Sequence, residues 1–259
     1  MKNTALITGA SGGIGKEFAI IHAQKWGNLV LVARTEKKLV ELKKQLESEH
    51  GVKIKILVKD LILAGSVQSI FDELQAENIE IDILINNAWF WGLWKFYERK
   101  WEKDKAMIDL NIGVLTELTR LFLPSFVEKN SWRVLNVSST ASLLPWPWQA
   151  VYYATKAYVT SFSNALAEEL YDTNVTVTAL LPWATETDFW KVSGMDKTKL
   201  FVKTANARDV ALAWYQAMLD WKLNVIAGLT LSQKMLMKTL PFIPQKVLLK
   251  TIRKGQEVN

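Results

Sequence analysis

Tyr152 and Lys156 are the side chains of this sequence best placed to move a proton. They stand four residues apart within residues 151–171, whose apolar pattern predicts a long helix, and residues at this spacing share one helix face. A neighbouring ammonium stabilises a phenolate, so we expect Lys156 to lower the pKa of Tyr152 from its usual value of about 10. Alone, such a pair is more often accidental than catalytic, and Tyr153 lies within one turn of the same lysine.

A serine follows the strand predicted for residues 134–137. Ser139 places a hydroxyl just beyond the carboxyl end of a central strand, which is where substrates bind in parallel sheets covered by helices. Such a hydroxyl is suited to hold a carbonyl oxygen. The alternative is an ordinary turn, which a serine pair after a strand also forms.

The segment 8–15 is rich in glycine and joins an apolar strand, residues 5–7, to a helical pattern that continues through residue 23. Glycines between a strand and a helix N-terminus let backbone N–H groups reach a pyrophosphate. A glycine turn alone is a weak signal, but this chain goes on to alternate strands and helices as a dinucleotide site requires. The predicted cofactor contacts in the turn are Gly9, Ser11, Gly12, Gly13, Ile14 and Gly15.

Arg34 stands at the end of the second predicted strand, residues 29–33. An acidic residue there would accept hydrogen bonds from a free ribose 2′-hydroxyl. A guanidinium instead suits a 2′-phosphate through paired, charge-assisted contacts, so the sequence predicts NADP(H) as the cofactor. The alternative is an exposed arginine with no ligand.

The elements that position these residues form an alternating series. Short apolar runs without polar alternation indicate strands buried on both faces, so we predict a doubly wound parallel sheet, a three-layer αβα Rossmann fold. Strands are expected at 5–7, 29–33, 53–58, 81–85, 134–137, 175–181 and 224–227, and helices after the glycine turn and at 36–49, 66–77, 104–128, 151–171 and 207–221.

The composition excludes several classes of site. The 259 residues fit one domain, and without cysteine there are no disulfides, thiolate metal sites or cysteine nucleophiles. The two histidines, His22 and His50, are read as ordinary surface or helix-end residues, so we expect no metal. The net charge of +6 comes from lysines mixed with glutamates on helix faces, which argues against nucleic acid as a partner. No membrane-spanning run or signal-peptide pattern is found, which favours the cytoplasm.

Two later segments depart from the alternating pattern. Residues 187–205 are expected to form a lid on the substrate side. Residues 229–259 form a basic, amphipathic extension, for which contact with a membrane surface is conceivable. Packing on the domain or on another subunit is favoured, because Pro241 and Pro244 interrupt any continuous helix.

Together these motifs resemble the short-chain dehydrogenase/reductase family over nearly the whole chain. Residues 8–15 match the family's TGxxxGxG, residues 86–88 its NNAG, and residues 152–156 its YxxxK. Asn111 matches the asparagine of the fourth helix, Ser139 the catalytic serine, and residues 182–187 the PGxxxT segment. Residues 150–159 and 165–170 look most like a bacterial branch of ketone and aldehyde reductases labelled DltE-like.

The resemblance implies an NADP(H)-dependent oxidoreductase that moves a hydride between nicotinamide and a carbonyl or secondary alcohol. It selects Tyr152 over Tyr153 as general acid and base, with Lys156 on the nicotinamide ribose, Ser139 on the carbonyl and Asn111 in a proton relay. It further implies a homodimer or homotetramer. An NADP(H)-binding sensor without turnover is the alternative. The remaining cofactor contacts implied are Asp60, Leu61, Asn87, Ala88, Pro182, Thr185 and Thr187.

Tryptophan replaces glycine at several positions of the resemblance. The chain has 12 tryptophans, and Trp89 and Trp183 stand where NNAG and PGxxxT have glycine. An indole cannot supply the positive φ or the close backbone approach for which glycine is used. The other tryptophans that look similar are Trp26, Trp91, Trp132, Trp146 and Trp148.

Two hypotheses account for these indoles. They could line an apolar substrate pocket, as aromatic residues commonly do. That leaves unexplained Trp26, Trp132, Trp214 and Trp221, which we expect at turns or helix ends remote from the pocket. The preferred hypothesis is that the gene uses UGA as a glycine codon, as some genetic codes do, and that UGA is read here as tryptophan.

Overall fold

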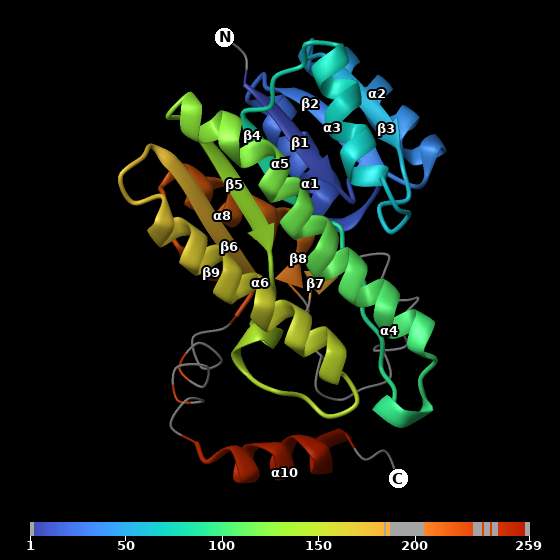
Figure 1. Ribbon diagram of the computed structural model, residues 1–259, viewed down its shortest axis with the longest axis vertical. Coiled ribbons are helices and arrows are strands. Elements are labelled where there is room, and N and C mark those ends of the chain that lie inside the picture. The colour runs from blue at the N-terminus through green and yellow to red at the C-terminus, as the bar shows by residue number, and fades with distance from the viewer. Residues whose placement is uncertain are drawn as a thin grey trace.

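The computed structural model describes residues 3–183, 185–186, 205–229, 235, 239 and 243–256. Its centre is a seven-stranded parallel sheet with the order β3-β2-β1-β4-β5-β6-β9 (Figure 1). The strands are β1 Thr4–Thr8, β2 Asn28–Ala33, β3 Ile54–Val58, β4 Ile83–Asn86, β5 Trp132–Val137, β6 Val175–Pro182 and β9 Asn224–Ala227. The strand order reverses between β1 and β4, so the predicted doubly wound sheet is confirmed.

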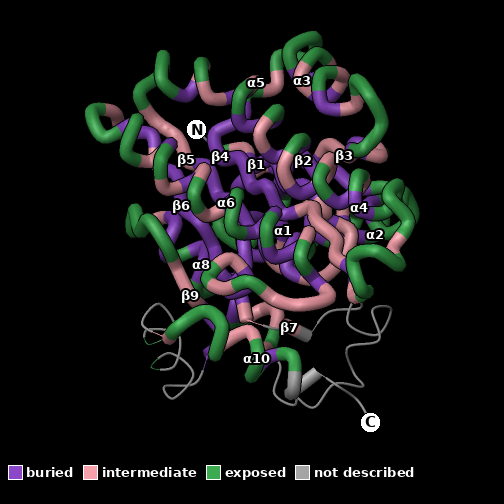
Figure 2. The backbone as a smooth tube through the Cα atoms, turned by 60° about the horizontal axis from the view of Figure 1, so that its bottom comes forward, coloured by how far each residue is buried: buried purple, intermediate pink, exposed green. Residues whose placement is uncertain are grey.

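Helices cover both faces of the sheet, so the central strands β1, β2 and β4 are almost entirely buried, whereas the edge strands β3 and β9 are partly exposed (Figure 2). One core cluster joins the sheet to α1 Gly13–Gln24, α2 Glu36–His50 and α8 Ala207–Leu219. The other joins it to α3 Ser66–Ala76, α5 Leu115–Glu128 and α6 Ala150–Glu169. On β1, Ala5 and Ile7 belong to the first cluster and Leu6 to the second, because successive strand residues point to opposite faces.

The predicted helix over 104–128 is interrupted. It begins earlier, as α4 Trp101–Ile108, passes through a π-helical turn η2 Asp109–Val114, and continues as α5. π-Helical turns are rare and often occur at functional sites, and neither periodicity nor composition indicates this one. Short 3₁₀ turns lie at η1 Phe96–Glu98 and η3 Thr140–Leu143.

The carboxyl-terminal third is described in part. A short parallel pair, β7 Thr185–Glu186 with β8 Ala205–Asn206, was not predicted. Of the predicted lid, only residue 205 lies within the described residues. In the carboxyl-terminal extension, α10 Gln245–Gln256 begins directly after Pro244. Across the part of the chain that is described, no helix combines the length and apolar character needed to cross a membrane.

The prediction for His22 is wrong, whereas His50 ends α2 as expected. The His22 ring is buried between α1 and α8, with Nδ1 2.7 Å from the Tyr215 hydroxyl and Nε2 3.1 Å from the Asn3 carbonyl oxygen. Burial lowers the pKa of His22 from 6.5. The periodic pattern of α1 does not reveal that α8, nearly two hundred residues away, covers this position.

The placement of Trp214 is also corrected. It lies inside α8 rather than at a turn or helix end, and it is fully buried with its ring centroid 6.3 Å from that of Phe18 on α1. Trp214 is therefore a core residue with ordinary helical backbone, unlike the tryptophans at the ends of α1 and α8.

Candidate functional site

The glycine turn between β1 and α1 is closely packed and braced by β4. Gly9 has a φ of 67°, and a Cβ on Gly15 would lie 2.4 Å from the Gly9 carbonyl oxygen. The Asn87 side-chain amide donates to the Thr8 carbonyl at 2.9 Å. The Thr8 hydroxyl accepts from the backbone N–H groups of Asn87 at 2.9 Å and Ala88 at 3.0 Å. These contacts hold the carboxyl ends of β1 and β4 together at the reversal of strand order.

A cavity of about 400 Å³ opens above this turn, at the carboxyl ends of β1 to β4. Most of the predicted cofactor residues line it, namely Gly9, Ser11, Gly12, Gly13, Ile14, Arg34, Asp60, Leu61, Asn87 and Ala88. Gly15 lies beneath the turn, in contact range of Gly9 and Asn87. Pro182 ends β6 and Thr185 begins β7, outside this lining, and Thr187 lies outside the described residues. The cavity has the size of a ligand site and suits an extended dinucleotide.

Positive charge gathers at one end of the cavity. Arg34 follows β2, and Lys38 stands one helical turn later on α2, so both side chains border the same space. Lys59, at the end of β3, is the third cation in the lining. Of these three cations, the sequence predicts only Arg34 as a cofactor contact. The spacing of Arg34 and Lys38 could have identified the second cation, but the position of Lys59 depends on the pairing of β2 with β3.

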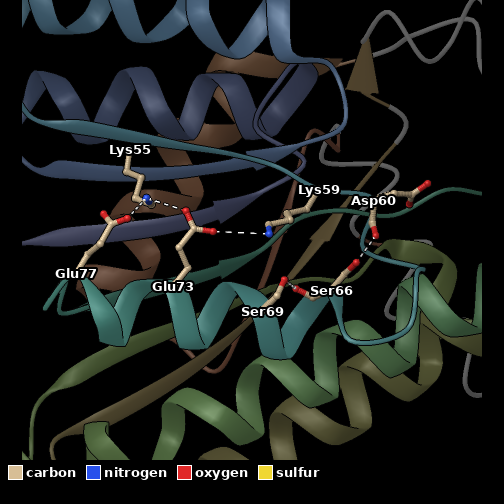
Figure 3. Close-up of polar contacts among 7 residues, drawn as sticks. All are labelled: Lys55, Lys59, Asp60, Ser66, Ser69, Glu73 and Glu77. Atoms are coloured by element: carbon tan, nitrogen blue, oxygen red, sulfur yellow. Dashed lines mark hydrogen bonds and ion pairs between the residues drawn. The ribbon is translucent and has the colours of Figure 1, made fainter.

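The loop after β3 is fixed by α3 (Figure 3). The Asp60 carbonyl accepts from the Ser66 hydroxyl at 2.7 Å. Glu73 of α3 lies 3.6 Å from the Lys59 ammonium and 2.8 Å from that of Lys55. These contacts position Lys59 and Asp60 beside the cavity.

Tyr152, on α6, lies next to Ser139, which follows the carboxyl end of β5. Burial raises the pKa of Tyr152 to about 12, and a hydrogen bond with the Ser139 side chain opposes that rise. Ser139 follows β5, and its hydroxyl accepts from the backbone N–H of Ala141 at 3.1 Å. The expected lowering of the Tyr152 pKa is therefore wrong for this arrangement, because the loss of solvent outweighs any stabilisation of the phenolate.

Lys156 follows Tyr152 by one helical turn on α6. Its ammonium donates to the Val137 carbonyl at 2.8 Å and lies 5.9 Å from the centre of the Tyr152 ring. Burial lowers the pKa of Lys156 to about 7. The loss of solvent therefore disfavours the charged form of both side chains.

Asn111 ties the loop after β4 to α6. Its side-chain oxygen accepts from the Phe90 N–H at 3.1 Å, and its amide donates to the Phe90 carbonyl at 3.0 Å and to the Thr155 hydroxyl at 3.1 Å. Asn111 stands in the π-helical turn η2. Sequence reasoning did not identify Thr155, although it lies within the same Tyr-to-Lys segment.

Tyr153 has different neighbours. Its ring stacks on Trp146, with centroids 5.4 Å apart, and burial raises its pKa. Ser139 acts on the pKa of Tyr152 and not on that of Tyr153, so the two tyrosines differ in their surroundings.

Trp89 adjoins both the cavity and the tyrosine–lysine pair. Its indole lines the cavity, with its ring 5.1 Å from the Lys156 ammonium and its centroid 5.9 Å from that of Tyr152. Among the described residues, the lining of the 400 Å³ cavity does not include Ser139, Tyr152 or Lys156. The indole therefore contacts both the cavity and the residues suited to proton transfer.

Comparison with known proteins agrees with this geometry. A family model described as short chain dehydrogenase matches residues 3–198. The chain is 32% identical over 198 residues to a very-long-chain 3-oxoacyl-CoA reductase of Anas platyrhynchos, covering 73% of this chain and 62% of that protein. It is 35% identical over 189 residues to an NADP-dependent 3-hydroxy acid dehydrogenase of Schizosaccharomyces pombe, covering 72% and 73%. The chain thus spans less than two thirds of the Anas reductase.

Solved structures share the whole architecture. A short-chain dehydrogenase from Sphingobium yanoikuyae, in complex with NADPH, has a TM-score of 0.84 at 30% identity. The match covers 95% of this chain and 94% of that one. The likeness extends beyond the glycine turn to the full sheet and the helices on both faces.

Proposed function

Because this chain belongs to the short-chain dehydrogenase family, we propose that it reduces a carbonyl compound to an alcohol with NADPH, and catalyses the reverse reaction. The observation that carries the proposal is the placement of Ser139, Tyr152 and Lys156 together at the end of β5, next to a dinucleotide-sized cavity. Relatives named as NADP-dependent or solved with NADPH support the choice of cofactor.

The residues present fit NADPH. The glycine turn lines the cavity, where its backbone N–H groups suit the pyrophosphate, and Arg34 with Lys38 suits the 2′-phosphate. Asp60 and Leu61 border the adenine side. The contacts proposed for the nicotinamide side are Asn87, Ala88, Pro182, Thr185 and Thr187.

The proposed chemistry needs an acid beside the carbonyl oxygen. When bound, NADPH supplies the hydride to the carbonyl carbon. Ser139 holds the carbonyl oxygen, and the Tyr152 hydroxyl donates its proton to that oxygen as the alcohol forms. With a pKa raised to about 12, Tyr152 is protonated at neutral pH, which suits reduction. Lys156 binds the nicotinamide ribose, while Asn111 supports proton return from solvent.

The test is NADPH oxidation over a panel of aldehydes and ketones, with Tyr152→Phe compared against Tyr153→Phe. We expect Tyr152→Phe to reduce turnover by about 10²–10⁴-fold, the usual contribution of a general acid. NADPH affinity should change little, because only the hydroxyl is removed. Tyr153→Phe should retain activity. Equal turnover in Tyr152→Phe and the parent would refute the assignment.

One observation favours a second candidate, an NADP(H)-binding protein without turnover. The Trp89 indole contacts Lys156 and lines the same cavity as Asp60 and Leu61 on the adenine side, so it can affect the tyrosine–lysine pair without closing the adenine side. Calorimetry that detects NADPH binding, with no activity across aldehydes, ketones and alcohols, would favour this candidate over the reductase.

The branch of the family, the oligomeric state and the cellular location stay predictions. The DltE-like branch rests on two segments of α6, whereas the two curated relatives above come from a bird and a yeast. A homodimer or homotetramer rests on the family resemblance, and light scattering measures it. A cytoplasmic location rests on the sequence pattern and is tested by fractionation of the host cell.

A further inference from the structure

Four tryptophans occupy backbone conformations that side chains avoid. Their φ angles are positive, at 57° for Trp26, 124° for Trp132, 62° for Trp148 and 59° for Trp221. L-residues reach positive φ at a steric cost, and for a bulky residue such an angle is an outlier. Four outliers of one residue type point to a common cause.

Trp26 stands at the glycine position of a helix end. Its N–H donates to the Ala23 carbonyl at 2.8 Å, and the Gly27 N–H donates to the His22 carbonyl at 3.1 Å. With α1 ending at Gln24, these bonds form a Schellman motif in which Trp26 is the left-handed residue. That residue is usually glycine.

The end of α8 repeats the motif. The Trp221 N–H donates to the Met218 carbonyl at 3.4 Å, and the Lys222 N–H to the Ala217 carbonyl at 3.0 Å. The tryptophan is again the left-handed residue after the cap. Its indole is exposed, so packing does not compensate for the backbone conformation.

Other helices of the chain show what this position normally carries. Asn78 and Asn130 occupy it after α3 and α5, with φ of 53° and 47°. Gly51 follows α2 with a φ of 62°. Asparagine and glycine tolerate left-handed backbone, and tryptophan does not.

The remaining two tryptophans with positive φ lie at the start of β5 and just before α6. Trp132 begins β5, and its φ of 124° lies in none of the regions that L-residues normally populate. Trp148 directly precedes Gln149, the residue before α6, and its carbonyl accepts from the Trp94 N–H at 2.9 Å. Both positions favour glycine for backbone reasons alone.

Composition agrees with this pattern. The chain has 12 glycines, whereas average usage of about 7% would give about 18 in 259 residues. Tryptophan is as frequent as glycine here, with 12 of each. The deficit in glycine is thus matched by an excess of the residue that stands in glycine conformations.

We propose that residues 26, 132, 148 and 221 are glycine in the protein its own host makes, because UGA in this gene encodes glycine. The same reading assigns glycine to positions 89 and 183, where the family resemblance has it. With glycine at 89, the indole that lines the cavity and contacts Lys156 is gone, which leaves more room beside the tyrosine–lysine pair. This last consequence rests on the proposed function, whereas the backbone argument does not.

The codons test the proposal directly. Sequencing the gene from its host should find UGA at positions 26, 132, 148 and 221, and also at 89 and 183. UGG at the four positions of positive φ would overturn it. Trp214 lies in ordinary helix, so its codon is not constrained by this argument.

Stability gives an independent test that does not involve activity. Trp26→Gly and Trp221→Gly should each raise Tm by about 2–4 °C, because each removes a left-handed bulky residue. Trp101→Gly is the matched control, since Trp101 is 62% exposed, against 67% for Trp26 and 56% for Trp221, but lies in helical backbone at the start of α4. It should leave Tm unchanged or lower it.

Alanine separates backbone from size. Trp26→Ala removes the indole but keeps a Cβ at positive φ, so its Tm should stay below that of Trp26→Gly. Equal Tm for the alanine and glycine variants, or no gain from either glycine, would refute the backbone argument.

Trp89→Gly then tests the extension to the site. It should increase turnover with NADPH or tighten its binding, and Trp101→Gly, which lies outside the cavity lining, should not. A gain in Tm for Trp26→Gly and Trp221→Gly with no turnover in Trp89→Gly would uphold the glycine reading and count against the reductase. Turnover without any gain in Tm would uphold the reductase and overturn the glycine reading.

Discussion

The glycine turn allows a sharp test of packing, because two of its glycines have opposite surroundings. A Cβ on Gly15 would lie 2.4 Å from the Gly9 carbonyl oxygen and 2.5 Å from the Asn87 side-chain nitrogen. A Cβ on Gly12 would have no protein atom within 4 Å, and its φ of −175° is open to any residue. Gly15→Ala should therefore disrupt the turn, whereas Gly12→Ala should leave its backbone unchanged.

The magnitude follows from the contacts that Gly15→Ala disturbs. Overpacking against fixed backbone costs about 1–3 kcal/mol. Displacing the Asn87 amide from the Thr8 carbonyl adds about 0.5–1.5 kcal/mol for one hydrogen bond. The free energy of unfolding should thus fall by about 2–4 kcal/mol, which lowers Tm by at least about 4 °C for a chain of this size. Gly12→Ala should stay within about 1 kcal/mol of the parent.

Thermal and denaturant unfolding of the two variants measure this difference. Calorimetric titration with NADPH provides the second readout, because the displaced turn should bind pyrophosphate less tightly in Gly15→Ala. If Gly15→Ala unfolds at the same temperature as Gly12→Ala, the turn is looser than these distances require, and the packing argument is wrong.

Two further predictions concern charge. Arg34→Asp should weaken NADPH binding by about 10–100-fold while NADH binding changes less, because a charge-assisted contact contributes about 1.5–3 kcal/mol. Lys37→Asp makes the same charge change outside the cavity lining and should preserve the preference for NADPH over NADH. Equal affinities of the unmodified protein for the two cofactors would show that Arg34 faces solvent only. Burial lowers the pKa of folded His22, so the unfolded chain binds the extra proton first and stability is lost as pH falls below 6.5, by up to about 1.4 kcal/mol per pH unit. Urea unfolding at pH 7.5 and 5.5 should show a smaller loss in His22→Gln, and an identical loss would contradict this role.

The sequence by itself determines the alternating architecture and the order of the chemically important segments. The strand at 224–227 is predicted at its observed bounds, and most helices differ by a residue or two at their ends. These features follow from local rules, because apolar period and turn chemistry act over a few residues. The spacing of Tyr152 and Lys156 likewise requires only a helix to place both on one face.

Other properties were decided by tertiary contacts. Asn111 lies in the π-helical turn, and its side chain forms hydrogen bonds with Phe90 and Thr155, which lie on separate elements. His22 is buried by Tyr215, 193 residues away in the chain. No periodic pattern in the sequence contains such pairings, because they arise only when the helices pack on the sheet.

The pKa values of the site residues and the access of a ligand to them also depend on tertiary packing. The sequence predicts that Lys156 lowers the pKa of Tyr152, yet burial raises the tyrosine pKa to about 12 and lowers that of the lysine to about 7. The Trp89 indole packs against Tyr152 beside the cavity. Residue type sets which proton can move. The surrounding packing sets whether its charge is solvated and whether a ligand can reach it, because solvent exclusion is a property of the assembled fold.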